Sequence, residues 1–273
     1  MTIIQAIILG IVQGLTEFLP ISSSAHLVLV PYWFEWELSA DQAFVFDVLV
    51  QMGTLVAVII YFARDIWAIM KGLIAGIAAK TPFKTYEYKV GWLVILATIP
   101  AGIAGLLLKD KVEAAFANPY LVAVFLLVTA VLIAVAEWVG KKVRATEDMN
   151  FLDALIIGIF QALAIFPGIS RSGSSISGGL LRNLNRQTAA KFSFIISIPI
   201  MLAAGLMGAL DLLDVANLAQ FLPVMVIGFV VSGVVGYLSI RWLMRFITRQ
   251  PLTYFSIYCI LVATVTFIIH HVR

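Results

Sequence analysis

The sequence predicts an all-α integral membrane protein with six transmembrane helices, two re-entrant helix-loop-helix elements and an inverted-topology repeat. Three observations lead to this fold class. Hydrophobic residues make up 62% and charged residues only 12% of the 273-residue chain, whereas soluble domains are about 45–50% apolar and about 25% charged. Six uncharged runs are long enough to cross a bilayer, and one segment recurs in both halves of the chain.

The predicted spans follow from hydropathy. A membrane-spanning helix needs about 20 mainly apolar residues. Two shorter apolar segments, 2–16 and 154–166, each lead directly into a stretch rich in proline, serine or glycine. Irregular backbone at membrane depth must be covered by protein or water, so we expect these two segments to form re-entrant elements. The six expected spans are residues 48–63, 90–108, 114–136, 192–210, 215–240 and 250–269.

Lysine and arginine orient these spans. Fourteen of the 18 basic side chains fall in the connections after the first, third and fifth spans, and only Lys109, Lys111 and Arg273 fall on the other side. Arg171 is set aside because it belongs to a re-entrant element. By the positive-inside rule, both termini face the outside. We expect the stretch 64–89 to lie at the interface beside anionic membrane lipids.

An internal repeat relates the two halves, about 1–145 and 150–273, of what we expect to be a single membrane domain, 1–273. With a shift of 148, residues 6–26 align without a gap on residues 154–174, and ten of the 21 pairs are identical. Each half holds an odd number of spans, so the second copy is expected to be inverted relative to the first. Residues 20–26 and 167–174 should then face each other across one pocket near the midplane.

Polar residues gather in both repeated elements. Polar and charged groups inside a membrane are costly, so a functional site is the first hypothesis for them. The second element contains an arginine beside serines that can cap a helix. A helix start and an arginine both bind anions, so this element is a good cradle for a phosphate group. The first element contains Gln13, Glu17, Ser22, Ser23, Ser24 and His26, and the second contains Ser170, Arg171, Ser172, Gly173 and Ser174.

These groups together suit phosphoryl transfer. The cradle would neutralise phosphate charge, a serine or water would attack, and His26 or Glu17 would move a proton. Each residue also has a structural interpretation: serines often bond local carbonyl groups, and Glu17 with Arg171 could form a structural ion pair. A transporter or lipid flippase is the alternative function, because inverted repeats with broken helices are common in secondary transporters.

The motifs resemble those of the bacterial undecaprenyl-diphosphate phosphatase family, the bacitracin-resistance type. The resemblance rests on Gln13-x-x-x-Glu17, on Pro20-Ile21-Ser22-Ser23-Ser24-Ala25-His26, and on Pro167-Gly168-Ile169-Ser170-Arg171-Ser172-Gly173. It implies hydrolysis of undecaprenyl diphosphate to undecaprenyl phosphate and inorganic phosphate, which recycles the lipid carrier of cell-wall synthesis and confers bacitracin resistance. It also implies a multi-pass protein of the bacterial plasma (inner) membrane whose site faces the outer, periplasmic side.

The resemblance implies a role for each site residue. Glu17 corresponds to the essential carboxylate, and Gln13 to the first position of its motif, so both are expected to hold a divalent cation, Mg²⁺ or Ca²⁺. Ser23 corresponds to the nucleophile and His26 to its base or to the acid for the leaving group. Whether a phosphoserine forms or water attacks directly stays open. The expected substrate contacts are Arg171, Ser22, Ser24, Ser170, Ser172, Gly173 and Ser174.

The expected partners follow from the same composition. With 18 basic and 15 acidic side chains and a net charge of +3, the chain lacks the strongly basic surface that nucleic-acid binding requires, so we expect no nucleic-acid partner. The expected partners are the polyprenyl diphosphate substrate and membrane lipids, and the sequence is compatible with a homodimer.

Overall fold

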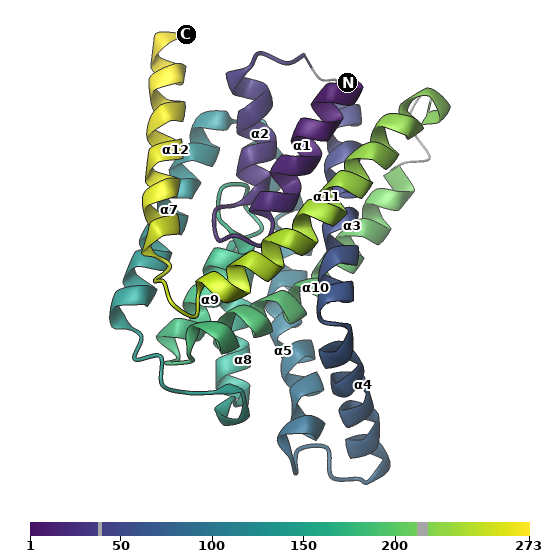
Figure 1. Ribbon diagram of the computed structural model, residues 1–273, viewed down its shortest axis with the longest axis vertical. Helices are drawn as coiled ribbons and strands as arrows, with labels where there is room; N and C mark the ends of the chain where they lie inside the picture. Colours follow the sequence, from purple (N-terminus) through teal and green to yellow (C-terminus); the bar gives the residue numbers. More distant parts are fainter. Residues whose placement is uncertain (38–39, 212–217) are drawn as a thin grey trace.

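A computed structural model describes residues 1–37, 40–211 and 218–273, and these residues form twelve α-helices and one short 3₁₀ helix (Figure 1). The helices are α1 (Ile3–Thr16), α2 (Ser23–Trp33), α3 (Ala40–Tyr61), α4 (Ala63–Ala78), α5 (Tyr86–Leu107), α6 (Lys109–Phe116), α7 (Pro119–Val139), η1 (Thr146–Asp148), α8 (Phe151–Leu163), α9 (Arg171–Leu181), α10 (Arg186–Asp211), α11 (Leu218–Phe246) and α12 (Thr253–Val272).

The expected membrane spans are present as helices. Among the described residues, α5, α7, α10, α11 and α12 contain stretches long and apolar enough to cross a membrane. The expected span 48–63 lies mainly in α3. Helix α3 meets the length and hydropathy of a membrane span only together with α4, and the two helices are bent by 74° at the break between them. Residues 215–217 of the expected span 215–240 lie outside the described residues. The all-helical membrane fold is therefore confirmed, with the first span broken.

The two re-entrant elements are the pairs α1–α2 and α8–α9. Both pairs break where the sequence places proline or glycine. In the second pair, Gly168 has a φ of +104°, and a β-carbon there would come within 2.4 Å of the carbonyl oxygen of Val122. Only glycine fits this close approach of two backbones. Serine caps the helix that follows each break, Ser22 for α2 and Ser170 for α9.

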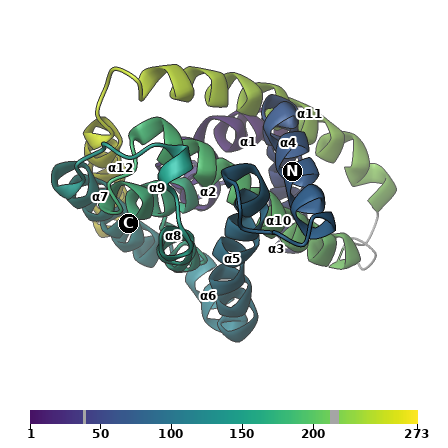
Figure 2. The ribbon, with the colours of Figure 1, turned by 90° about the horizontal axis from the view of Figure 1, so that it is seen from below.

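The two pairs enter the molecule from opposite ends. In Figure 1, α1 and α2 extend from the upper end, where both termini lie, and α8 comes from the lower end. Helix α1 packs on α11, and its counterpart α8 packs on α5, while α7 and α12 pack on each other (Figures 1 and 2). This placement is the one that an inverted repeat requires, and it brings the tips of the two pairs together at mid-height.

Ion pairs at the lower end fix the second re-entrant element. Asp153, in the first turn of α8, is fully buried and accepts hydrogen bonds from Arg144 at 2.9 Å and Arg182 at 2.7 Å. Arg182 directly follows α9, so one carboxylate joins the start of α8 to the end of α9. The hydrogen bond to Asp153 raises the pKa of Arg144 above its usual value. Loss of Asp153 would leave two arginines without their partner.

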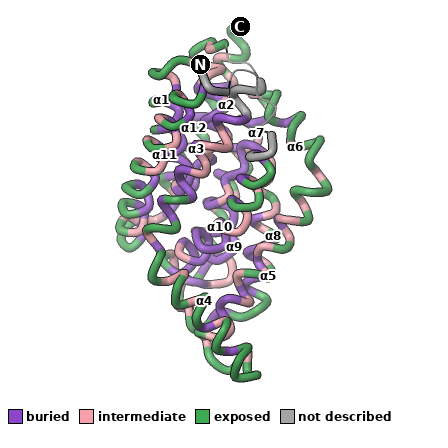
Figure 3. The backbone as a smooth tube through the Cα atoms, turned by 90° about the vertical axis from the view of Figure 1, so that its right-hand side faces the viewer, coloured by how far each residue is buried: buried purple, intermediate pink, exposed green. Residues whose placement is uncertain are grey.

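Burial follows the expected membrane arrangement. Figure 3 shows the buried residues gathered at mid-height around α9 and α10, with exposed residues on the outer helices. Many of the exposed side chains are large and apolar, for example Leu106 (75% exposed), Leu206 (71%) and Trp138 (87%). An exterior of this kind is stable only against lipid. The buried carboxylates include Glu17 at the first tip and Glu137 and Asp153, which pair with arginines outside the tips.

Candidate active site

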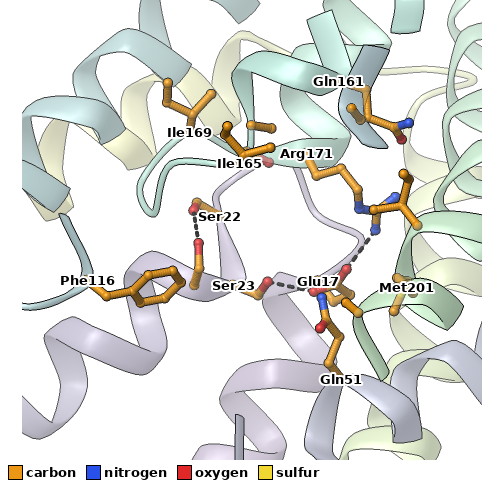
Figure 4. Close-up of a pocket in the computed structure, with 16 residues that line it drawn as sticks. Glu17, Ser22, Ser23, Gln51, Phe116, Gln161, Ile165, Ile169, Arg171 and Met201 are labelled. Carbon is orange, nitrogen blue, oxygen red and sulfur yellow. Dashed lines mark hydrogen bonds and ion pairs between the residues drawn. The ribbon is translucent and has the colours of Figure 1, made fainter. Parts of the chain in front are cut away.

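A pocket of about 190 Å³ lies between the tips of the two re-entrant elements (Figure 4). Its polar wall comes from the starts of α2 and α9 and from the connection after α1. Its apolar wall comes mainly from α5, α6, α10 and the connection after α8. The lining residues are Glu17, Ser22, Ser23, Ser24, Gln51, Ala101, Phe116, Gln161, Ala164, Ile165, Ile169, Ser170, Arg171, Ile200, Met201 and Ala204. Of the two segments expected to share one pocket, 20–26 and 167–174, residues 22–24 and 169–171 line it.

Glu17 lies at the centre of the hydrogen-bond network in this pocket. Its Oε1 accepts a hydrogen bond from Arg171 Nη2 at 2.7 Å, and its Oε2 accepts one from Ser23 Oγ at 2.6 Å (Figure 4). The Glu17 side chain is 3% exposed and that of Arg171 is 14% exposed. The pair joins residues 154 positions apart, so it ties the two repeats together. A buried carboxylate is stable only with such partners.

Gln13 orients Glu17 from the preceding turn of α1. Its Nε2 donates to Glu17 Oε2 at 3.0 Å and to Thr54 Oγ1 of α3 at 3.3 Å. Gln13 is 1% exposed and does not line the pocket. An amide nitrogen is not a metal ligand, so Gln13 in this arrangement positions the carboxylate and offers no oxygen to a cation beside it.

Ser22 sets the geometry of the first tip. Its backbone has a φ of 68°, a conformation that is strained for a residue with a side chain. Its Oγ accepts from the N–H of Ala25, which caps α2, and lies 3.2 Å from Ser24 Oγ. Because the cap holds the start of α2 in place, the next residue, Ser23, reaches Glu17. The strain and the cap together fix the hydroxyl that faces the carboxylate.

The second tip repeats this geometry around Ser170. Its Oγ accepts from the N–H of Gly173 at 3.0 Å and lies 3.2 Å from Ser172 Oγ. Its own N–H donates to Thr129 Oγ1 of α7 at 2.8 Å. Arg171 follows as the first residue of α9, and its Nη1 is buried with no hydrogen-bond partner. A buried guanidinium nitrogen without a partner is available to an oxygen of a ligand.

The electrostatics of the pocket favour an anion. The starts of α2 and α9 both line the pocket, and the positive end of each helix dipole favours negative charge. Serine hydroxyls and the unpartnered Arg171 Nη1 add hydrogen-bond donors. Among the residues that the structure describes, Glu17 and Arg171 are the only charged ones that line the pocket, and their formal charges cancel. The donors are therefore arranged for phosphate oxygens, while the site itself supplies no excess positive charge.

The structure separates the residues expected in the site into two groups. Glu17, Ser22, Ser23, Ser24, Ser170 and Arg171 line the pocket. The remaining expected residues lie behind it: Ser172 Oγ donates to the carbonyl of Leu19 at 3.1 Å, and Gly173 donates to the Ser170 cap. Ser174 is fully buried, and its hydroxyl has no hydrogen-bond partner. These three residues position the tip of α9 and do not line the pocket.

His26 also lies outside the pocket lining. Its Nδ1 is 2.8 Å from the carbonyl oxygen of Ser22, and its Nε2 is 2.9 Å from the hydroxyl of Tyr258 in α12. A carbonyl only accepts, so Nδ1 carries the proton and the neutral ring accepts from Tyr258 at Nε2. The two rings also stack, with centroids 5.6 Å apart. His26 therefore holds the strained carbonyl of Ser22 in this arrangement.

Sequence reasoning did not single out several residues that line the pocket. Gln161, Phe116 and Met201 come from α8, α6 and α10. Phe116 and Met201 gave no signal, because apolar residues are expected throughout a membrane protein. Gln161 did give one, since it aligns with Gln13 in the repeat. A polar identity between the two copies was a reason to expect it at the site.

The donor set of the pocket fits a hard divalent cation that arrives with its own oxygen ligands. Carboxylate, hydroxyl and carboxamide oxygens are the ligands that Mg²⁺ and Ca²⁺ prefer. In the described part of the chain, no group of three or more His, Cys, Asp or Glu side chains is placed to hold a metal ion. Glu17 is the one acidic residue in the lining. A cation here would need phosphate oxygens of a substrate to complete its coordination.

Comparisons with known proteins identify the family of this chain. Residues 6–265 match the family model described as "Bacitracin resistance protein BacA". The chain belongs to this family. Its relatives include an undecaprenyl-diphosphatase of Corynebacterium striatum, 43% identical over 94% of this chain and 91% of the relative. An undecaprenyl-diphosphatase of Methanosphaera stadtmanae is 44% identical over 98% of each chain, and one of Chlorobium limicola is 42% identical over 97% and 95%. The family resemblance noted in the motifs is therefore confirmed over nearly the whole chain.

Proposed function

We propose that this protein hydrolyses undecaprenyl diphosphate to undecaprenyl phosphate and inorganic phosphate. The observation that carries the proposal is the contact between Ser23 Oγ and Glu17 Oε2 at 2.6 Å, beside an arginine that has one free buried donor. A hydroxyl, a base and a phosphate cradle are the groups that phosphoryl transfer requires. The proposed substrate follows from the name of the relatives, undecaprenyl-diphosphatase.

The terminal phosphate would lie between Arg171 and Ser23. Arg171 Nη1 and the start of α9 bind its non-bridging oxygens. Ser23 Oγ then attacks phosphorus while Glu17 takes the hydroxyl proton, and the bond from phosphorus to the bridging oxygen breaks. Undecaprenyl phosphate leaves with the bridging oxygen and takes the proton from Glu17, which becomes a carboxylate again. Glu17 then takes a proton from water as the water oxygen attacks phosphorus. The bond from phosphorus to Ser23 Oγ breaks, Glu17 returns the proton to Oγ, and inorganic phosphate is released.

Direct attack by water is the other route through the same groups. In that case Glu17 deprotonates water, and Ser23 only positions the carboxylate. Phosphate release by a Ser23→Ala variant separates the two routes. A serine nucleophile predicts loss of turnover to background, and direct water attack predicts retained turnover with a higher KM.

The apolar wall of the pocket suits the prenyl chain. The apolar lining residues include Phe116 of α6, Ile169 of the connection before α9 and Met201 of α10. A prenyl chain would lie along such apolar side chains and pass to lipid while its diphosphate reaches the polar tips. Only the released phosphate would then need a path to water.

The proposed membrane is the bacterial plasma membrane, with the pocket open to its outer side. Two observations support this side. The connection between α4 and α5 lies at the lower end, and Ala101 and Phe116 come late in α5 and at the end of α6, away from that connection along the chain (Figure 1). The connections between α4 and α5 and between α7 and α8 carry Lys80, Lys84, Lys141, Lys142 and Arg144. The positive-inside rule places these connections in the cytoplasm. Labelling of a cysteine introduced at residue 2 by an impermeant reagent in intact cells tests the orientation.

A divalent cation, Mg²⁺ or Ca²⁺, belongs to this proposal. When bound, it would neutralise charge that develops on the phosphate oxygens. The oxygen-rich lining and the absence of net positive charge in the pocket support it. Phosphate release measured with and without a chelator tests the requirement, and full activity in chelator would contradict it.

The decisive experiment measures phosphate release from a polyprenyl diphosphate by the purified protein. Glu17→Ala and Arg171→Ala are each expected to abolish it, and wild-type activity in either variant would overturn the site. The same protein in sealed vesicles tests the alternative function. A flippase or transporter would move substrate across the membrane without free phosphate, whereas the phosphatase releases phosphate in proportion to substrate lost.

A further inference from the structure

Gln161 has an unused acceptor in the pocket. The residue is 2% exposed, lines the pocket from α8, and its Oε1 is buried without a hydrogen-bond partner. Nearly all buried polar atoms in native proteins have a partner, so an unpaired one beside a ligand pocket points to the ligand. Phosphate oxygens are themselves acceptors, so this acceptor needs another kind of partner.

The orientation of the Gln161 carboxamide is fixed by its other end. Nε2 donates to the carbonyl oxygen of Ala97 in α5 at 3.4 Å. Exchange of the two amide atoms would set Oε1 against that carbonyl, and two acceptors repel each other. Oε1 therefore stays on the side away from Ala97. In Figure 4 the side chain of Gln161 is seen beside that of Arg171 at the pocket.

The repeat explains why this oxygen has no partner within the protein. In the first copy, Gln13 donates to Glu17, one helical turn later. In the second copy, the residue one turn after Gln161 is Ile165, which offers no polar group. The glutamine is therefore present in both copies, but only the first has a carboxylate to orient. The second glutamine lines the pocket, and its acceptor has no partner within the protein.

Charge balance indicates what this acceptor binds. A diphosphate carries several negative charges at neutral pH, whereas Glu17 and Arg171 leave the pocket formally neutral. Positive charge must therefore enter with the substrate. Glu17 is already engaged by Arg171, Ser23 and Gln13. An oxygen ligand other than Glu17 would hold a cation and leave these hydrogen bonds intact.

We propose that Gln161 Oε1 is a direct ligand of the divalent cation that enters with the diphosphate. This inference rests on the proposed function. Glu17 keeps its bonds to Arg171, Ser23 and Gln13 and stays free to act as the base when Gln161 holds the cation.

The test measures cation binding directly, not activity. Mn²⁺ serves as the probe, and its bound fraction is followed by electron paramagnetic resonance. The protein is saturated with a prenyl methylenediphosphonate, a substrate analogue that cannot be hydrolysed. Gln161→Met removes the oxygen at nearly constant volume and is expected to weaken Mn²⁺ binding at least about tenfold. Gln161→Glu keeps an oxygen ligand and is expected to bind Mn²⁺ at least as tightly as the wild type.

Gln187→Met is the matched control, because Gln187 is exposed near the start of α10 and outside the pocket lining. It should bind Mn²⁺ like the wild type. Thermal unfolding checks that each variant is folded. Wild-type Mn²⁺ affinity in folded Gln161→Met would overturn the proposal. So would an equal loss of analogue binding in the absence of Mn²⁺, because Gln161 would then contact the substrate itself.

Failure of this inference differs from failure of the proposed function. If the wild type releases no phosphate from any polyprenyl diphosphate, the proposed function fails whatever the Mn²⁺ titration gives. If the wild type releases phosphate and Gln161→Met binds Mn²⁺ normally, the function stands and only the ligand assignment falls.

Discussion

The two re-entrant elements share a scaffold but carry different chemistry. In the alignment of the repeat, Ser22 matches Ser170 and Ser24 matches Ser172. Each first serine caps the following helix, and each pair of hydroxyls is 3.2 Å apart. The repeat has therefore kept the cap and turn that point a helix start at the pocket. These shared serines build the frame of the site.

The reactive groups stand where the copies differ. Glu17 matches Ile165, Ser23 matches Arg171, and His26 matches Ser174. The first element thus supplies the base and the hydroxyl, and the second supplies the guanidinium. A phosphate between the two tips would meet a nucleophile from one side and a charge clamp from the other. The two helix starts are thus alike in the two copies, and the groups proposed for the chemistry lie at three positions where the copies differ.

The two tips also differ in backbone strain. Ser22 has a φ of 68°, whereas Ser170, at the same place in the second copy, has a φ of −67°. Strained residues persist where the surrounding structure holds them, commonly at functional sites. Here His26 donates to the Ser22 carbonyl, and the second tip has no histidine at that position. The backbone strain therefore lies in the first element, which also carries the proposed nucleophile.

The largest expected effect comes from removing the carboxylate that the second copy lacks. Glu17→Gln keeps the shape of the side chain but cannot take a proton, so kcat for phosphate release should fall about 10²–10⁴-fold. Steady-state phosphate release measures it. Unchanged kcat would mean that the two elements do not differ in catalytic role.

A smaller loss of activity is expected when Arg171 is replaced by lysine, which keeps the positive charge but lacks the planar guanidinium group. Arg171→Lys removes at least one charge-assisted hydrogen bond to phosphate, worth about 1.5–3 kcal/mol, so kcat/KM should fall roughly ten- to hundredfold. Gln187→Met, which alters an exposed polar residue outside the pocket, is the control. A lysine variant with wild-type kcat/KM would show that the second element contributes charge alone.

Replacement of His26 tests whether it moves a proton or holds the strained tip. His26→Phe keeps the stacking on Tyr258 and removes both hydrogen bonds of the ring. We expect about a tenfold lower kcat, as for a lost hydrogen bond that positions a reactive group, with the same shape of the pH–rate profile. Loss of one limb of that profile would instead identify His26 as a catalytic acid or base.

The smallest effects concern the two caps. Ser170→Ala removes the cap of α9 and should lower the free energy of unfolding by about 1 kcal/mol. Ser22→Gly also removes a cap, but glycine relieves the positive φ, so its cost should be smaller. Thermal unfolding of the two variants in the same detergent compares them. A larger loss for Ser22→Gly would contradict the assignment of strain to the first tip.

Much of the site was visible in the sequence because polar groups are rare in this chain. Glu17, Arg171 and the serines stand out against apolar surroundings, and the repeat predicted that their segments meet. The sequence could not show which side of each helix start faces the pocket. Ser170 and Arg171 line the pocket, whereas Ser172 and Ser174 lie outside its lining. That distinction depends on how α9 packs against α7 and α10.

By itself, the sequence determined that the chain is a helical membrane protein with two broken elements, because hydropathy and helix-breaking residues act locally along the chain. The tertiary structure decided the pairing of Glu17 with Ser23 and Arg171, and it left the acceptor of Gln161 free. Those contacts join segments as far as 154 residues apart. Only the packing of two repeats from opposite ends sets the distance between such groups, because no local preference reaches across that separation.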